Sequence, residues 1–108
     1  MNFCYVQIEF LPKLSRIYMK MSSSKNVKAE LLGHRNEVQV LKLLPNCELA
    51  SGSLDNTIKI WNYERAQLNF TLVGHKDNIL VIEVLPDYEI ASGSADRTIR
   101  IWNTQTGK

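Results

Sequence analysis

The chain has 108 residues, of which 44% are hydrophobic and 22% are charged, and its net charge is +2. This length predicts at most one domain, and the composition is that of a globular protein rather than a disordered one. The sequence excludes a membrane-spanning helix, because no apolar run approaches the ~20 residues that such a helix needs. The small net charge also argues against a domain that binds nucleic acid over its whole surface.

Residues 1–25 form an N-terminal extension that we predict to be poorly ordered or to hold one short strand. Apolar and polar residues alternate from Val6 to Phe10, a period of two that favours a strand, and Pro12 ends it. The first 28 residues carry a net charge of +4, scattered along the segment, which we interpret as a solvated terminus. The alternatives are an arm for anionic surfaces or targeting, and an extension that precedes an internal start at Met19 or Met21.

The N-terminus has no pattern typical of a secretory signal. No basic residue precedes its apolar stretch, and no small-residue cleavage site follows it. We therefore expect a cytoplasmic or nuclear protein, in which Cys4 and Cys47 are free thiols. Two cysteines are too few for a disulfide scaffold or for a zinc site of two cysteine pairs, and the sequence predicts no metal and no cofactor.

Residues 26–108 contain a repeat with a period of 41 residues. Gly33-His34 recurs as Gly74-His75, and residues 31–62 share 17 identities in 32 positions with residues 72–103. The most similar stretches read LASGSLDNTIKIWN and IASGSADRTIRIWN. Such self-similarity predicts two duplicated structural units, repeat 1 at about 26–66 and repeat 2 at about 67–108.

Each unit has the pattern of short strands. Ile58 and Ile60 alternate with Lys59, and the equivalent residues of the second unit alternate in the same way. Pro45-Asn46 marks a turn, and Leu54-Asp55-Asn56 marks a tight hairpin between two strands. No segment shows a long period of 3.6 residues bounded by caps, so the region is predicted to be all-β with four strands per unit.

The 41-residue period, the Gly-His pair and the Trp near the end of a strand resemble the WD40 repeat. Both copies carry Gly-His, Ser-Gly-Ser, Asp-x-Thr-Ile and Ile-Trp in that order, although Trp-Asn stands where Trp-Asp is usual. The resemblance implies β-propeller blades, in which each repeat supplies the outer strand of one blade and three inner strands of the next. We therefore expect about two four-stranded antiparallel blades, with strands at 27–32, 37–44, 47–53, 57–62, 67–73, 78–85, 88–94 and 98–103.

The number of repeats predicts an incomplete propeller. Two repeats give one complete blade, one blade without its outer strand and one orphan outer strand at 27–32, whereas propellers close with about 4–8 blades. Either the chain is a fragment of a longer protein, which is the interpretation we favour, or it assembles with copies of itself.

Each unit also contains Ser, His and Asp, the residue types of a nucleophilic triad. We predict no catalytic residue, because a hydrolase needs one exposed and strained site, whereas this set occurs in both units and is followed by a Trp. The resemblance implies a structural hydrogen-bond chain instead, in which Asp accepts from His, His reaches Ser, and Ser reaches the Trp indole. The two predicted hydrogen-bond chains consist of His34, Ser51, Asp55 and Trp61, and of His75, Ser92, Asp96 and Trp102. Ser53 and Ser94 are the less favoured alternatives to Ser51 and Ser92.

The resemblance implies a non-catalytic scaffold for protein–protein interaction, with proteins or peptides as partners. The lack of a long apolar run argues against a membrane, and binding of nucleic acid through the basic N-terminus is a third, less favoured alternative. Candidate partner-binding residues follow each Gly-His pair or precede each turn Asp: Arg35, Glu37, Leu54, Lys76, Asn78 and Ala95. The alternative for each of these positions is ordinary solvent-exposed surface. The alternative for the whole chain is the propeller portion of a larger multidomain enzyme, such as a kinase or ubiquitin-ligase subunit.

Overall fold

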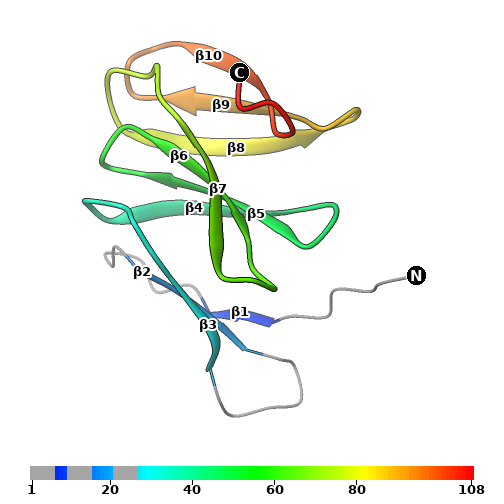
Figure 1. The fold of residues 1–108 in the computed structure, drawn as a ribbon. Helices are drawn as coiled ribbons and strands as arrows, with labels where there is room; N and C mark the ends of the chain where they lie inside the picture. The colour runs from blue at the N-terminus through cyan, green and yellow to red at the C-terminus, as the bar shows by residue number, and fades with distance from the viewer. Residues whose placement is uncertain (1–6, 10–15, 21–26) are drawn as a thin grey trace.

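The structure, a computed structural model, describes residues 7–9, 16–20 and 27–108 (Figure 1). These residues form ten strands and no helix. In chain order the strands are β1 (Gln7–Glu9), β2 (Arg16–Lys20), β3 (Val27–Leu32), β4 (Val38–Leu44), β5 (Glu48–Ser53), β6 (Ile58–Asn62), β7 (Gln67–Leu72), β8 (Ile79–Leu85), β9 (Glu89–Ser94) and β10 (Ile99–Asn103). Within the described ranges, therefore, no helix is long and apolar enough to cross a membrane.

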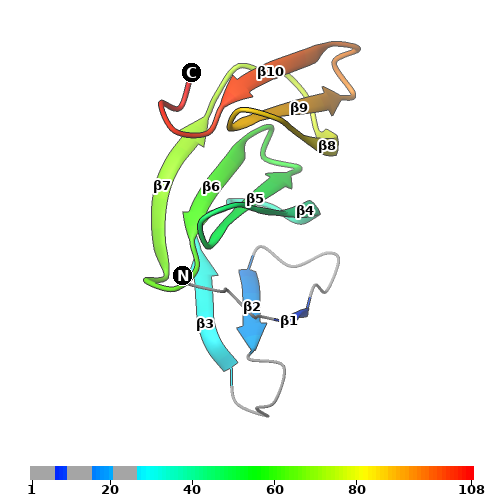
Figure 2. The same ribbon diagram turned by 90° about the vertical axis from the view of Figure 1, so that its right-hand side faces the viewer.

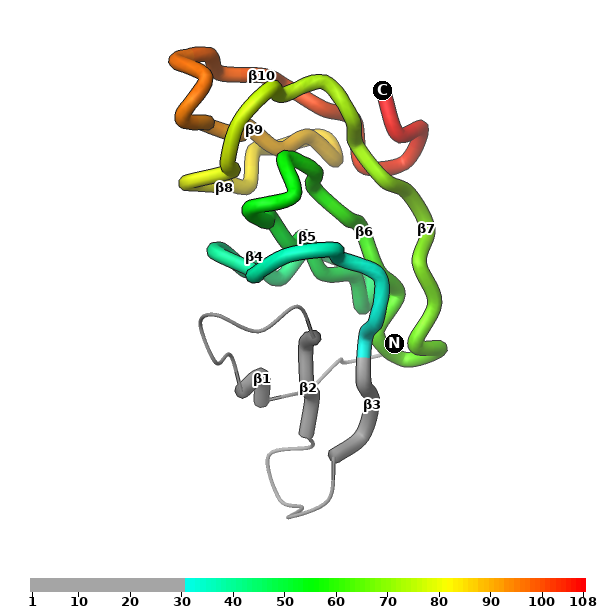
Figure 3. The backbone as a smooth tube through the Cα atoms, turned by 90° about the vertical axis from the view of Figure 1, so that its left-hand side faces the viewer, coloured from blue at the N-terminus to red at the C-terminus, as the bar shows by residue number. Residues whose placement is uncertain are grey.

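The strands form three antiparallel sheets that stack on one another (Figures 1 and 2). Strands β1, β2 and β3 make the N-terminal sheet, β4 to β7 make the first blade, and β8, β9 and β10 make the second blade. After β3 and again after β7 the chain crosses to the first strand of the next sheet, as the tube in Figure 3 shows for the second crossing. This arrangement confirms the prediction of all-β propeller blades in an open array.

The strand bounds between residues 27 and 103 lie within one residue of those predicted. The first blade has four strands, whereas the second blade has three, because in the described residues β10 pairs only with β9. The tight turns repeat as well. Asn46 and Cys47 both have positive φ, as do Asp87 and Tyr88, which is the conformation of a type I′ hairpin turn.

Strand β3 differs from the expected orphan strand. It pairs with β2, which in turn pairs with β1, so the N-terminal residues add two strands to it. The strand β1 lies inside the stretch that alternates from Val6 to Phe10, whose other residues fall outside the described ones. Strand β2 has no counterpart among the predicted elements.

The expectation of free thiols is wrong for Cys47, which is disulfide-bonded. Its side chain is buried in the turn between β4 and β5 and packs in a hydrophobic cluster. The bond was not predictable from the cellular compartment, because the sequence does not show which sulfurs lie close together in the fold.

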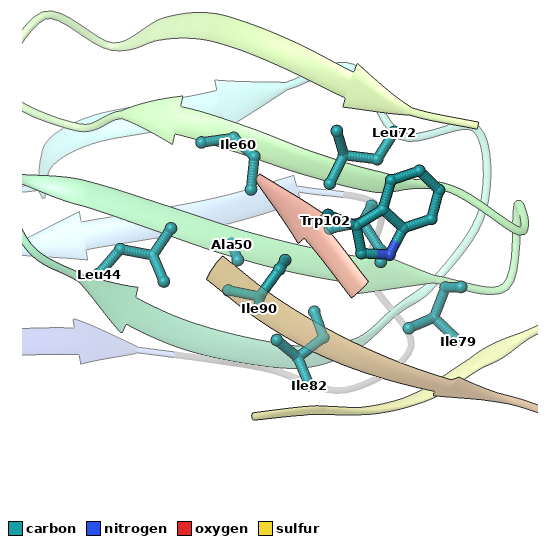
Figure 4. Close-up of a cluster of buried hydrophobic side chains, with 9 residues drawn as sticks. Leu44, Ala50, Ile60, Leu72, Ile79, Ile82, Ile90 and Trp102 are labelled. Atoms are coloured by element: carbon teal, nitrogen blue, oxygen red, sulfur yellow. The ribbon is translucent and has the colours of Figure 1, made fainter. Parts of the chain in front are cut away.

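Two hydrophobic clusters lie between the sheets. One covers the face of the first blade that carries Leu49 and Trp61, and it includes Leu31 from β3. The other joins the two blades: Ala50 and Ile60 of the first blade meet Ile82 and Ile90 of the second (Figure 4). The first blade is therefore covered on both faces, and nearly all residues of its strands β5 and β6 are buried.

Candidate functional site

The predicted polar residues of each repeat converge at one end of the blade. His34 lies in the loop between β3 and β4, Ser51 lies in β5, Asp55 lies in the turn after β5, and Trp61 lies in β6. The tight β5–β6 turn brings these segments together, because it aligns Ser51 opposite Lys59 in the ladder.

The four side chains form one continuous chain of hydrogen bonds. Asp55 Oδ2 lies 2.8 Å from His34 Nδ1, and His34 Nε2 lies 2.6 Å from Ser51 Oγ. The indole Nε1–H of Trp61 donates to the same Ser51 oxygen at 2.8 Å. The rings of His34 and Trp61 also meet edge to face, with centroids 6.2 Å apart.

The second repeat reproduces this geometry. Asp96 Oδ2 lies 2.9 Å from His75 Nδ1, His75 Nε2 lies 2.7 Å from Ser92 Oγ, and Trp102 Nε1 donates to Ser92 Oγ at 2.8 Å. We call the two sets the polar networks. In both, the structure brings together Asp, His, Ser and Trp, with Ser51 and Ser92 in the central position.

Ser53 and Ser94 do not belong to the polar networks and form other hydrogen bonds. The Ser53 hydroxyl donates to the backbone oxygen of Asn36 at 3.2 Å and accepts from the backbone N–H of Asp55 at 3.0 Å. The Ser94 hydroxyl makes the equivalent contacts in the second repeat. These serines therefore hold the hairpin turn against the Gly-His loop without touching the His.

Threonine side chains complete the networks, although they were not among the predicted network residues. The Thr57 hydroxyl donates to Asp55 Oδ1 at 2.6 Å, and its backbone N–H donates to the same oxygen at 2.9 Å. Thr98 does the same for Asp96. The repeated Asp-x-Thr spacing was the available signal, since an Asp side chain readily accepts from the residue two positions ahead.

Burial and hydrogen bonds fix the protonation states around Asp55. Burial alone raises the pKa of Asp55, but the hydrogen bonds from Thr57, His34 and Arg35 together outweigh it and lower the pKa to about 2. Burial lowers the pKa of His34 below its usual value, against the opposing effect of Asp55. A neutral His34 then donates from Nδ1 to the carboxylate and accepts the Ser51 hydroxyl at Nε2. In the second repeat, the hydrogen bond from Thr98 is the main cause that lowers the pKa of Asp96.

This arrangement shares the connectivity of a catalytic triad but lacks the access that catalysis requires. Ser51 and Ser92 are both 0% exposed, and each oxygen already accepts an indole N–H. A nucleophile must reach a substrate carbonyl, which neither oxygen can do. In the described residues every buried side-chain polar atom has a hydrogen-bond partner, so the networks satisfy polar groups inside the blade. The same part of the chain contains no group of three residues able to hold a metal.

The six candidate partner-binding residues lie beside the networks, in the loops that the networks join. The backbone N–H of Arg35 donates to Asp55 at 3.0 Å, and that of Leu54 donates to the Glu37 oxygen at 2.9 Å. Lys76 and Ala95 repeat these bonds with Asp96 and Asn78. Of the six side chains, Arg35, Lys76 and Ala95 are exposed, and Glu37, Leu54 and Asn78 are half-buried.

A polar hollow of about 320 Å³ opens next to the first network. It is lined by Gly33, Arg35, Asp55, Thr57, Lys59 and Thr71. Lys59 is largely buried there and donates from Nζ to the Thr71 hydroxyl at 2.9 Å. Lys59 was predicted only as the polar residue of an alternating strand, so its place in this hollow is a feature that the sequence did not reveal.

Comparison with known proteins agrees with this geometry. The family model described as WD domain, G-beta repeat matches residues 25–62 and 66–103, which is more than half of the chain. No curated protein gave a significant match. The two matched segments each contain one Gly-His loop, one polar network and one Trp. The chain therefore belongs to the WD40 (WD domain, G-beta repeat) family.

Proposed function

We propose that this chain is a non-catalytic scaffold that binds other proteins or peptides through the loops beside the two polar networks. WD40 repeats serve generally in protein–protein interaction, and the residues that would bind here are the six candidates named above. The expected location of such a scaffold is the cytoplasm or the nucleus, which imaging of the tagged protein would test.

One observation carries the proposal: the two repeats keep the same supporting residues but present different side chains on the loops. All four residue types of the networks are identical in both repeats. The adjoining loop positions instead pair Arg35 with Lys76, Glu37 with Asn78, and Leu54 with Ala95. A rigid frame that carries varied loops is the usual way in which a fold presents a binding surface.

The polar hollow adds a chemical feature to this surface. Arg35 is exposed at its edge and Lys59 is buried at its wall, so two cations lie near the Asp55 carboxylate. A partner with a polar or acidic group could place that group beside Arg35 while an apolar group contacts Leu54. Charge reversal at Arg35 should therefore weaken binding.

The test compares the proteins captured by the immobilised chain with those captured by an Arg35→Glu/Lys76→Glu variant. Both residues lie on the candidate surface and are exposed, so the fold should survive the change. The matched control is Arg65→Glu, the same charge reversal on an exposed turn between β6 and β7. Partners that the wild type and the control retain and the loop variant loses support the proposal. Capture that is equal for all three proteins contradicts it.

A further inference from the structure

Lys59 is a buried cation that forms no ion pair with a carboxylate of the described residues. It belongs to β6, is 9% exposed, and donates from Nζ to the Thr71 hydroxyl at 2.9 Å. This bond uses one of the three N–H donors of the ammonium. Within the described ranges, the ion pairs are the two His–Asp pairs of the polar networks, and neither includes Lys59. A buried charge is costly unless a partner compensates it.

The Asp55 carboxylate lines the same hollow, but its oxygens are already occupied. Oδ1 accepts the hydroxyl and the backbone N–H of Thr57, at 2.6 and 2.9 Å. Oδ2 accepts the backbone N–H of Arg35 at 3.0 Å and lies 2.8 Å from His34 Nδ1. Each oxygen therefore has two donors, which matches the two lone pairs that a carboxylate oxygen offers. Asp55 thus holds the loops together and leaves Lys59 available to another acceptor.

The backbone around Lys59 buries its stem and leaves its ammonium at the hollow. A Cβ added at Gly33 would lie 3.6 Å from both Cδ and Cε of Lys59, so the Gly-His loop passes directly over the stem. Thr71 of β7 stands opposite Lys59 in the ladder and receives the ammonium from the other side. The lysine is therefore fixed between a loop and a strand of the complete first blade.

The hollow presents donors that have no acceptor in the part of the chain that the structure describes. Two are the remaining N–H groups of Lys59, and a third is the O–H of Thr71, which can donate while its oxygen accepts from Lys59. The exposed Arg35 lines the same hollow and carries a guanidinium with several further donors. Thr57 differs, because its O–H already donates to Asp55. The site is thus rich in donors and poor in free acceptors.

The charge of the hollow favours a ligand with one negative charge. Lys59 and Arg35 bring two positive charges and Asp55 brings one negative charge, so one positive charge is left over. Burial lowers the pKa of His34, so its neutral ring adds no charge. A carboxylate neutralises this excess. A phosphate monoester carries about −1.5 to −2 at neutral pH and would leave a negative excess beside Asp55.

The size of the hollow agrees with a small group. Its volume of about 320 Å³ lies at the low end of the ~300–1,000 Å³ that is typical of ligand pockets. It is lined by the Gly-His loop, the hairpin after β5 and strands β6 and β7. Arg35 is exposed there, so the side chain of a partner can enter while the partner's backbone stays outside.

We infer that this hollow binds a side-chain carboxylate of a partner protein, with the Lys59 ammonium, the Thr71 hydroxyl and the Arg35 guanidinium as donors. The inference rests on the proposed function, because it names the chemical group by which a partner engages the loop surface. Hydrogen bonds between charged donors and a carboxylate are about twice as strong as neutral ones. The partner's carboxylate gives Lys59 the counter-charge that the described residues do not supply.

The test titrates the full ¹⁵N-labelled chain with four probes and follows the amide signals of Arg35, Thr57 and Thr71 by NMR. The probes are sodium acetate, the blocked peptide acetyl-Ala-Glu-Ala-amide, the same peptide with Gln in place of Glu, and inorganic phosphate. Sodium chloride keeps the ionic strength constant, because salt screens exposed charges. Acetate and the Glu peptide should shift these signals to saturation, and the Gln peptide should leave them unchanged.

Two variants test the assigned donors. Lys59→Met keeps an unbranched side chain in the buried strand and removes the charge, so binding of the Glu peptide should weaken at least ~10-fold. Thr71→Val keeps the β-branched shape and removes the hydroxyl, which should weaken binding ~5-fold. Thr71 is exposed, so this variant tests the site even if Lys59→Met fails to fold. Circular dichroism checks the fold of each.

The matched control is Arg65→Met, which removes one positive charge from the exposed turn between β6 and β7 and should bind as the wild type does. A chain that shows no saturable response to acetate and the Glu peptide overturns the site. A response to acetate alone overturns a partner's side chain as the ligand, and tighter binding of phosphate overturns the choice of a carboxylate. Equal binding by the wild type and both hollow variants overturns the roles of Lys59 and Thr71.

The capture experiment separates this inference from the proposed function. If Arg35→Glu/Lys76→Glu loses partners that Lys59→Met retains, the loop surface binds proteins but the carboxylate site is overturned. If the Glu peptide binds and capture is nevertheless equal for all variants, the hollow accepts a carboxylate and the proposed function is contradicted.

Discussion

At the scale of single residues, Asp55 links more of the first repeat than any other side chain described above. Its two oxygens accept hydrogen bonds from Thr57, from His34 and from the backbone of Arg35. These donors come from two segments about 20 residues apart. The carboxylate therefore joins the loop after β3 to the hairpin after β5, and the rest of the network continues the link into the core.

The Asp55 carboxylate should make stability fall in acid. Its pKa is about 2 in the folded chain and about 4 in an unfolded one, so the unfolded state binds a proton more readily. The stabilisation is complete above about pH 4 and is lost as the pH falls toward about 2. Urea unfolding between pH 5 and pH 2 measures this loss. An Asp55→Asn variant should lose less stability over the same range, and an identical loss would contradict the assignment.

Trp61 should be the most costly residue of the first network to truncate. Its side chain is 2% exposed, and its indole N–H donates to Ser51. Trp61→Ala should lower the free energy of unfolding by about 3–5 kcal/mol, the range for removing a large buried aromatic side chain. Chemical denaturation followed by circular dichroism gives the value. Unchanged unfolding would show that the assignment of β6 is wrong.

Most residues of the networks could be predicted from the sequence because both repeats carry them at the same spacing. The hydrogen bonds of Thr57 could not be predicted, because the repeat shows that a threonine is present but not where its hydroxyl points. The disulfide of Cys47 was also not predictable. The second repeat has Tyr88 at the equivalent position, so the repeat pattern gives no indication that Cys47 forms a disulfide.

At the scale of elements, the strands of the two repeats were predictable within one residue because apolar alternation and turn residues recur after 41 positions. Strand β2 was not predictable in the same way. It aligns with β6 by register, yet Lys20 stands where β6 has Trp61, and no Gly-His or Asp-x-Thr accompanies it. Its place became visible only through the ladder that it forms with β3.

The contact between the blades yields a prediction with an internal control. Gly52→Ala puts a Cβ 2.5 Å from Ile79 and should destabilise the chain by about 1–3 kcal/mol, as overpacking does. Gly93→Ala meets only Val81 of the same sheet and should cost less. Thermal unfolding of both variants at low concentration compares them. Equal losses would contradict the packing of β8 against Gly52.

At the scale of the whole molecule, three stacked sheets leave one apolar face and one strand edge open at the second blade. The number of repeats in the sequence predicted an incomplete propeller. The repeats could not predict that β2 pairs with β3, because that pairing depends on contacts between segments without a shared motif.

The central claim is that the polar networks hold the loops of both repeats rigidly, so that these loops can serve as a binding surface. Amide hydrogen exchange at Arg35, Leu54, Lys76 and Ala95 tests it most directly. Each of these N–H groups donates a hydrogen bond that ties one loop to another, at 2.9 to 3.0 Å. We predict that they exchange as slowly as the amides of the adjoining strands, although they lie in surface loops. Exchange as fast as in an unstructured peptide would contradict the claim.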